Sequence, residues 1–237
     1  MSSTFIITRR EFRSYFDGPI AYVVLGLSLT IVGWVVFRDY WTINRATLAP
    51  LFQYLPWALV ILVIPAVTMR LLAEEKRTGT IELLITMPVR DLDVVLGKFL
   101  ATLALFFVML LLTVPYYFFI NRLGNVDWGP VASGYLGLLL LSAAGTAMGL
   151  FASSITENQI VAFMLTFCSL FVLWILDYVG AAAGGWLGDF FGFISFQRRL
   201  MPFTRGVIDL RNVVYFLSVA GFFLFLSVRS LESRRWK

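Results

Sequence analysis

The chain is organised as a series of long apolar runs separated by short charged segments. Two of these runs, about 51–72 and 92–120, flank the polar segment Ala73–Arg90, and each is long enough to cross a bilayer as a helix. The segment between them therefore has to lie in water or at the membrane surface. Because basic residues favour the cytoplasmic side of a membrane, we expect this segment in the cytoplasm. The basic residues in or beside it are Arg70, Lys76, Arg77, Arg90 and Lys98.

The composition supports a polytopic membrane protein. Of the 237 residues, 59% are hydrophobic and only 14% are charged, whereas about a quarter of the residues of a soluble domain are charged. The mean hydropathy is +0.85, so most of the chain is needed for membrane spans and no sizeable soluble domain is expected. The net charge of +5 does not indicate nucleic acid binding, because the basic residues adjoin apolar runs and form no single stripe.

Several classes of chemistry are excluded by the residues that the chain lacks. There is no histidine, and the one cysteine, Cys168, lies inside an apolar run. A histidine metal site, a Ser-His-Asp triad and a Cys-His pair are therefore impossible. The sequence also has no GxxxxGK[ST] loop for nucleotide phosphates. We expect a protein that is not itself an enzyme and that holds neither a metal nor a cofactor.

The apolar runs predict an all-α integral membrane fold with six transmembrane helices. Residues 4–16 place three phenylalanines on one helical face and arginines elsewhere, which indicates a helix in the membrane interface rather than a disordered basic tail. Residues 180–211 are too polar for a span and too aromatic for a plain loop, so we expect short helices that dip into the outer leaflet and return. The predicted spans are 19–37, 51–72, 92–120, 131–154, 159–176 and 213–228.

Two of the spans carry internal features with more than one interpretation. Pro56 and Pro65 kink the second span, either as hinge points or as a static kink filled by packing. Gly145 and Gly149 form a GxxxG pair in the fourth span, which allows close helix packing. We favour packing inside one subunit over a dimer contact for this pair.

The segment 74–87 has the pattern of a short amphipathic helix. Gly79 allows a positive φ, and Thr80 is a good N-cap for a helix that starts at the next residue. The apolar side chains of that helix fall on one face: Ile81, Leu84 and Ile85. A helix of about two turns is unstable alone, so it needs lipid headgroups or a groove in a partner protein.

The run EEKRTGTIELLITMPVRDLDVVLGKFLA resembles the coupling-helix region of ABC-2 type transporter permeases, in the branch of the gliding-motility and nitrous-oxide-reductase-maturation permeases. The runs TRREFRSYFDGPIAYV and FTRGVIDLRNVVYFLS extend the resemblance over nearly the whole chain. In that family the segment docks into a cytoplasmic ATP-hydrolysing subunit and transmits its movement. The resemblance assigns this role to Glu74, Glu75, Arg77, Thr78, Gly79, Thr80, Glu82, Leu83 and Leu84; the alternative is an ordinary interfacial loop with solvated charges.

The resemblance also implies a type V exporter-like architecture and a set of partners. We expect two copies of an ABC ATPase that bind ATP and Mg, a second permease half that is identical or related, membrane lipids, and an accessory protein outside the cytoplasm. The expected function is that of a permease subunit, with export as the direction; the alternative is a non-transporting scaffold of a membrane complex. The re-entrant element expected before the sixth span includes Phe196, Arg198, Arg199, Phe203 and Arg205, whose basic members meet anionic substrate or, more simply, lipid headgroups.

The distribution of Lys and Arg predicts the topology. With both termini inside, twelve of the 19 basic residues lie on the inner side and seven on the outer side. We therefore expect both termini in the cytoplasm and the protein in the bacterial inner membrane. The cargo stays open among lipid, polysaccharide, peptide, a copper or sulfur species, and mechanical work on a surface protein.

Overall fold

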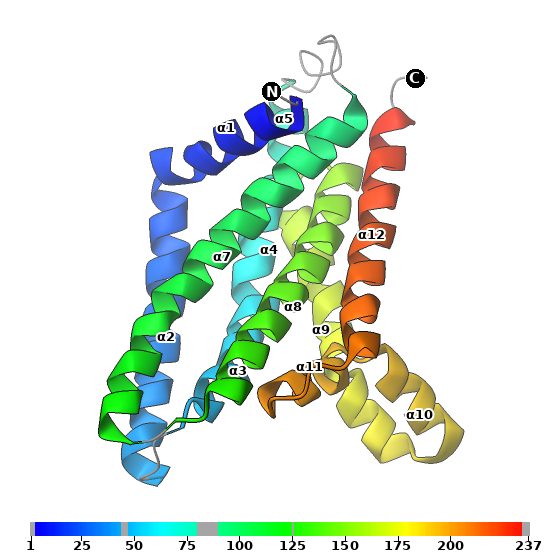
Figure 1. Cartoon of the computed structure of the whole chain (residues 1–237). Coiled ribbons are helices and arrows are strands. Elements are labelled where there is room, and N and C mark those ends of the chain that lie inside the picture. Colours follow the sequence, from blue (N-terminus) through cyan, green and yellow to red (C-terminus); the bar gives the residue numbers. More distant parts are fainter. Residues whose placement is uncertain (1–2, 44–46, 80–89, 125, 234–237) are drawn as a thin grey trace.

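Every regular element among the described residues is a helix. The computed structural model describes residues 3–43, 47–79, 90–124 and 126–233. Within these ranges six helices are long and apolar enough to cross a membrane. The prediction of an all-α fold with six spans is therefore confirmed, and Figure 1 shows them side by side as one bundle.

Both ends of the described chain lie at the same end of the bundle, which we call the terminal end (Figure 1). Helix α1 (Ser3–Asp17) lies across this end, and α2 (Pro19–Ile43) then runs away from it. The remaining long helices alternate in direction, so that α12 returns to the terminal end. They are α7 (Asp91–Leu123), α8 (Trp128–Ile155), α9 (Gln159–Ala183) and α12 (Leu210–Glu232).

The second span is built from several pieces rather than one regular helix. It comprises α3 (Ala49–Ala58), the π-helical segment η1 (Leu59–Val63), α4 (Ile64–Thr68) and, after a turn, α5 (Ala73–Arg77). Pro56 lies inside α3 and Pro65 at the start of α4. Because proline donates no backbone hydrogen bond, the widened π-helical turn lies between these two positions.

Helix α8 is the central helix, and its small residues explain why. Of its apolar window 83% is buried, against 22% for α9 and 17% for α12. A Cβ atom added at Gly145 would meet Ile64 at 2.7 Å, and one at Gly149 would meet Thr68 Oγ1 at 2.1 Å. The GxxxG pair thus packs against α4 of the same subunit, as the favoured interpretation expected.

At the end opposite the termini, two short helices connect α9 to α12. They are α10 (Gly185–Ile194) and α11 (Phe196–Thr204), which Figure 1 shows folded beside the lower ends of α8 and α9. Gly184 and Gly185 both have positive φ and allow the reversal after α9.

Two local expectations differ from the structure. Residues 180–183 continue α9, so the irregular segment is shorter than the sequence indicated. The predicted first span ends at residue 37, but α2 continues through Arg38 and Asp39, with Arg38 Nη2 3.2 Å from Asp39 Oδ1.

Candidate functional site

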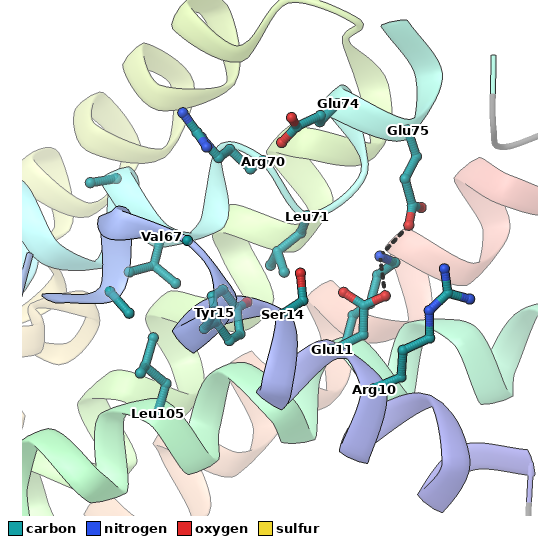
Figure 2. Close-up of a pocket in the computed structure, with 14 residues that line it drawn as sticks. Arg10, Glu11, Ser14, Tyr15, Val67, Arg70, Leu71, Glu74, Glu75 and Leu105 are labelled. Carbon is teal, nitrogen blue, oxygen red and sulfur yellow. Dashed lines mark hydrogen bonds and ion pairs between the residues drawn. The ribbon is translucent and has the colours of Figure 1, made fainter. Parts of the chain in front are cut away.

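A buried lysine joins three helices at the terminal end. Lys98 lies two turns into α7, and its side chain is only 2% exposed. Its Nζ atom is 2.6 Å from Glu75 Oε1 on α5 and 3.2 Å from Glu11 Oε1 on α1. Figure 2 shows both carboxylates directed toward this ammonium group. We call these three residues the charge cluster.

The charge cluster needs its two glutamates because the packing of α7 buries the charged end of Lys98. Burying a charged ammonium group is costly without a close opposite charge, and Glu75 and Glu11 supply that charge. The two carboxylate side chains are 21% and 23% exposed, so all three groups are largely withdrawn from solvent. A shift of any of the three helices would therefore separate charges in a poorly hydrated place.

Helix α1 is held to α7 along much of its length. Thr4 Oγ1 donates a hydrogen bond of 2.7 Å to Asp93 Oδ1, and the hydroxyls of Tyr15 and Thr102 are 2.8 Å apart. Burial raises the pKa of the Tyr15 phenol, so this group stays neutral. Ile7 packs so closely on Gly97 that an added Cβ would lie 2.6 Å from it. Helix α1 is thus part of the bundle and not a detached interfacial element.

Helix α5 is held on its other side by the end of α8. The Ser153 hydroxyl accepts hydrogen bonds from the backbone N–H of Leu72 (3.0 Å) and of Ala73 (2.9 Å), where the turn enters α5. Lys76 is 7% exposed, and its Nζ donates to the carbonyl of Ser154. Helix α5 is therefore connected both to α7 and α1 and to α8.

A cavity of about 370 Å³ lies beside the charge cluster, between α1, α4, α5 and α7. Figure 2 shows Tyr15 and Leu71 among its lining residues and Glu74 and Arg70 at the side of α5. The ion pairs that connect α1 with α5 therefore border a cavity and are not enclosed by packed side chains on that side. This arrangement leaves room for α5 to change position relative to α1.

The predicted coupling residues fall into three groups. Glu75 points inward into the charge cluster. Glu74, Arg77, Thr78 and Gly79 are exposed at the terminal end. The other four, Thr80, Glu82, Leu83 and Leu84, lie outside the described residues.

Helix α5 ends just before Gly79, where the sequence predicted a break. Thr78 is the C-cap residue, and Gly79 follows with φ of 72°, the left-handed conformation that the sequence predicted. The Thr78 hydroxyl donates a 2.9 Å hydrogen bond to the carbonyl of Glu74. Helix α5 therefore ends at a defined turn, directly before the predicted coupling helix.

The family of the chain follows from a comparison with protein-family models. The model described as "ABC-2 family transporter protein" matches residues 42–229, which include α3 to α11 and nearly all of α12. The chain belongs to the ABC-2 family of transporter proteins. A comparison with curated proteins found no match.

As an ABC-2 family member, this protein is the permease component of an ABC transporter and a multi-pass membrane protein. The family implies association with an ABC ATPase and dimerisation. The α1 end of the chain lies outside the matched range, yet α1 supplies Glu11 to the charge cluster.

The residues predicted for the re-entrant element have two different environments in this ABC-2 protein. Phe196 and Phe203 are fully buried; Phe196 packs edge-on against Phe216, with ring centroids 5.4 Å apart. Arg199 donates to Asn212 Oδ1 at 3.1 Å and lies 4.4 Å above the Phe193 ring.

The other two basic residues of this element are more exposed. Arg198 pairs with Asp177 at 3.8 Å, and Arg205 is exposed with its Nη2 3.8 Å from Met201 Sδ. The phenylalanines therefore anchor α11, while Arg198 and Arg199 connect it to α9 and α12.

Sequence reasoning missed Glu11 and Ser153, and it treated Lys98 only as a topology signal. The available signal was the position of Lys98, which is followed by a long apolar run and therefore requires a carboxylate partner. No local pattern shows that this partner comes from residue 11 and from residue 75.

Proposed function

We propose that this permease couples ATP hydrolysis by a separate ABC ATPase to movement of its membrane helices, through the segment that starts at α5 and continues to about residue 87. The observation that carries the proposal is the double attachment of α5. Lys98 holds it to α7 and α1, and Ser153 and Ser154 hold it to α8. A force applied to the exposed residues after α5 would reach α1, α7 and α8 through α5.

The proposed mechanism is a two-state movement of a rigid element. ATP and Mg bind to the ATPase pair, and its closure displaces the segment 78–87. Helix α5 follows, and the charge cluster passes the displacement to α7 and α1. The π-helical segment η1 and the prolines around it give the second span a place to bend. A path then opens between two permease halves.

The remaining parts of the proposal concern the assembly and its orientation. The working unit has two permease halves and two ATPases, in the bacterial inner membrane, with the terminal end in the cytoplasm. The basic residues at this end support that orientation. The direction of transport is export. Of the nine residues given above for coupling, Glu75 acts through the charge cluster, and the other eight form the ATPase contact.

The proposal is tested on the complex purified from mild detergent, with every subunit identified. An ABC ATPase should copurify with the full chain. Glu82→Lys and Gly79→Val should each lower permease-dependent ATPase activity at least about fivefold, the lower end of typical coupling between sites. Gly79→Val acts because a β-branched residue is strained at φ of 72°.

Gly221→Val is the matched control, because an added Cβ at Gly221 in α12 meets nothing within 4 Å. It should leave the activity unchanged. A complex without an ATPase would support the scaffold alternative. An ATPase that copurifies but works normally with both variants would contradict the role of the segment.

A further inference from the structure

A groove on the membrane face between α7 and α8 has an entirely apolar or aromatic lining. Its volume is about 360 Å³, within the range of about 300 to 1,000 Å³ for ligand pockets. Leu110 and Val131 form its floor, at 5% and 3% exposure. Phe107 and Leu111 form one edge and are about half exposed. Its lining residues belong to the second half of α7 and the first half of α8, which lie toward the end opposite the termini (Figure 1).

The floor of the groove exposes no polar atom that lacks a hydrogen-bond partner. Tyr135 lines it with its ring, while the Tyr135 hydroxyl is hydrogen-bonded to the Thr113 hydroxyl at 2.9 Å. On the side away from the groove, the ring of Tyr135 packs against Phe52 of α3, with ring centroids 5.5 Å apart. A ligand that fills the groove therefore needs apolar surface only.

The length of the groove matches one leaflet. Its α7 side runs from Phe107 to Tyr117, which at 1.5 Å per residue is about 15 Å, half of the ~30 Å hydrocarbon core. At the outer end Tyr117 and Trp128 pack edge to face across the two helices, with centroids 5.1 Å apart. Such aromatic residues belong at the headgroup level of a membrane.

The size of the groove selects between a helix and an acyl chain. A helix about 10 Å across would occupy roughly 1,200 Å³ over 15 Å, far more than the groove offers. One acyl chain fits.

The charges at the outer end favour a phosphate-bearing headgroup. Arg122 lies in the last turn of α7, Asp127 is the N-cap residue of α8, and Arg205 ends α11. An added Cβ at Gly206 would lie 3.3 Å from the nitrogen of Pro130, so the end of α11 borders the first turn of α8. Arg122 and Arg205 are both exposed, so each can meet the phosphate of a lipid headgroup at this level of the membrane.

We propose that this groove binds one acyl chain of a phospholipid from the leaflet at the end opposite the termini. The site depends on the α7–α8 geometry and not on coupling to an ATPase, so either proposal can fail without the other.

The test uses the full chain in phosphatidylglycerol nanodiscs that contain a phosphatidylglycerol with a photoreactive diazirine at mid-chain. Labelled residues are mapped by mass spectrometry. Labelling should concentrate on the groove and exceed that of the outward face of α12, represented by Leu217. Ala132→Trp fills the groove and should lower its labelling about tenfold, which corresponds to about 1.4 kcal/mol. Leu217→Trp, the matched control, should leave groove labelling unchanged.

Ala132 is exposed in the groove, so a larger side chain there does not enter the core. If Ala132→Trp does not elute as a single species, Ala132→Leu tests the same point with a smaller decrease. Equal labelling of the groove and of α12 would overturn the proposal. So would unchanged labelling in a folded Ala132 variant, or a crosslink from the groove to a second copy of the chain in place of lipid.

Discussion

The two ends of the bundle are held together by different kinds of contact. At the terminal end, buried polar groups join α1, α5, α7 and α8, with Lys98 and Lys76 both under 8% exposed. At the opposite end, α11 is held by aromatic side chains: Phe196 and Phe203 are fully buried against α8 and α12. The terminal end thus joins its helices through short charged contacts. The opposite end relies mainly on apolar area, to which the contacts of Arg198 with Asp177 and of Arg199 with Asn212 add.

This difference indicates which end of the bundle can change between two conformations. A charged contact of 2.6 Å loses most of its value when a helix moves by a few ångströms, so it defines one position of α5 and leaves a second position to be stabilised by other contacts. Packed aromatic rings resist displacement over a broad area. We therefore expect substitutions at the terminal end to change coupling, and those at the opposite end to change stability only.

The largest effect on stability is expected for Phe203→Ala. The side chain is fully buried and packs on Gly137, where an added Cβ would lie 2.8 Å from Phe203 Cβ. Removing the ring leaves a cavity, so the free energy of unfolding should fall by about 4 kcal/mol. The measurement is SDS-induced unfolding in mixed micelles, followed by circular dichroism.

Phe193→Ala is the control at the same end, because Phe193 is 63% exposed and should cost much less. In the folded fraction of Phe203→Ala, the permease-dependent ATPase rate should equal that of the wild type. A lowered rate there would show that the opposite end also takes part in coupling.

Lys98→Met should have the next largest effect, and it should change both the stability of the protein and its coupling to the ATPase. It leaves Glu11 and Glu75 facing each other without the ammonium group, which should lower the free energy of unfolding by about 3 kcal/mol. The same variant should uncouple ATPase activity, since α5 loses its charged connection to α7. Unfolding and ATPase measurements on the same preparation check both.

The triple variant Lys98→Met, Glu11→Gln, Glu75→Gln separates the two effects. With no charge left to bury, stability should return to near the wild-type value, while coupling should stay low. If the triple variant recovers coupling together with stability, the charge cluster has only a structural role.

The sequence was sufficient for the architecture because the membrane imposes it. Apolar runs of about 20 residues leave few alternatives to spanning helices, and Gly79 marked the end of α5 through its backbone freedom alone. These are local properties, readable without knowledge of neighbouring helices.

The partners of Lys98 could not be predicted in the same way. Glu11 and Glu75 are 87 and 23 residues away from it, and their meeting depends on how α1 crosses the end of the bundle. The same holds for Ser153, which looks like one of several small residues in α8. Arg198 and Arg199 looked like lipid ligands, because their partners Asp177 and Asn212 lie on other helices.

Gly149→Ala tests the packing of α8 on α4 near the terminal end. An added Cβ would lie 2.1 Å from Thr68 Oγ1, so α4 would have to move away from α8. Overpacking of this kind should lower the free energy of unfolding by about 2 kcal/mol. Gly221→Ala, with nothing within 4 Å, should instead be neutral or slightly stabilising, and the same SDS titration compares the two.

The smallest effect is expected for Ser153→Ala, and it gives the sharpest test of the comparison. The change removes the acceptor for the N–H groups of Leu72 and Ala73, whose residues are 1% and 0% exposed, at a cost of about 1 kcal/mol. The matched control is Ser142→Ala in the same helix, because the Ser142 hydroxyl donates only to the carbonyl of Leu138 within α8. If the position of α5 controls coupling, Ser153→Ala should change permease-dependent ATPase activity more than its small effect on the free energy of unfolding would suggest. Ser142→Ala should change neither the ATPase activity nor the free energy of unfolding. A Ser153→Ala protein with unchanged ATPase activity would mean that the hydrogen bonds of Ser153 take no part in coupling, and that the displacement passes through the charge cluster or through Lys76 and Ser154.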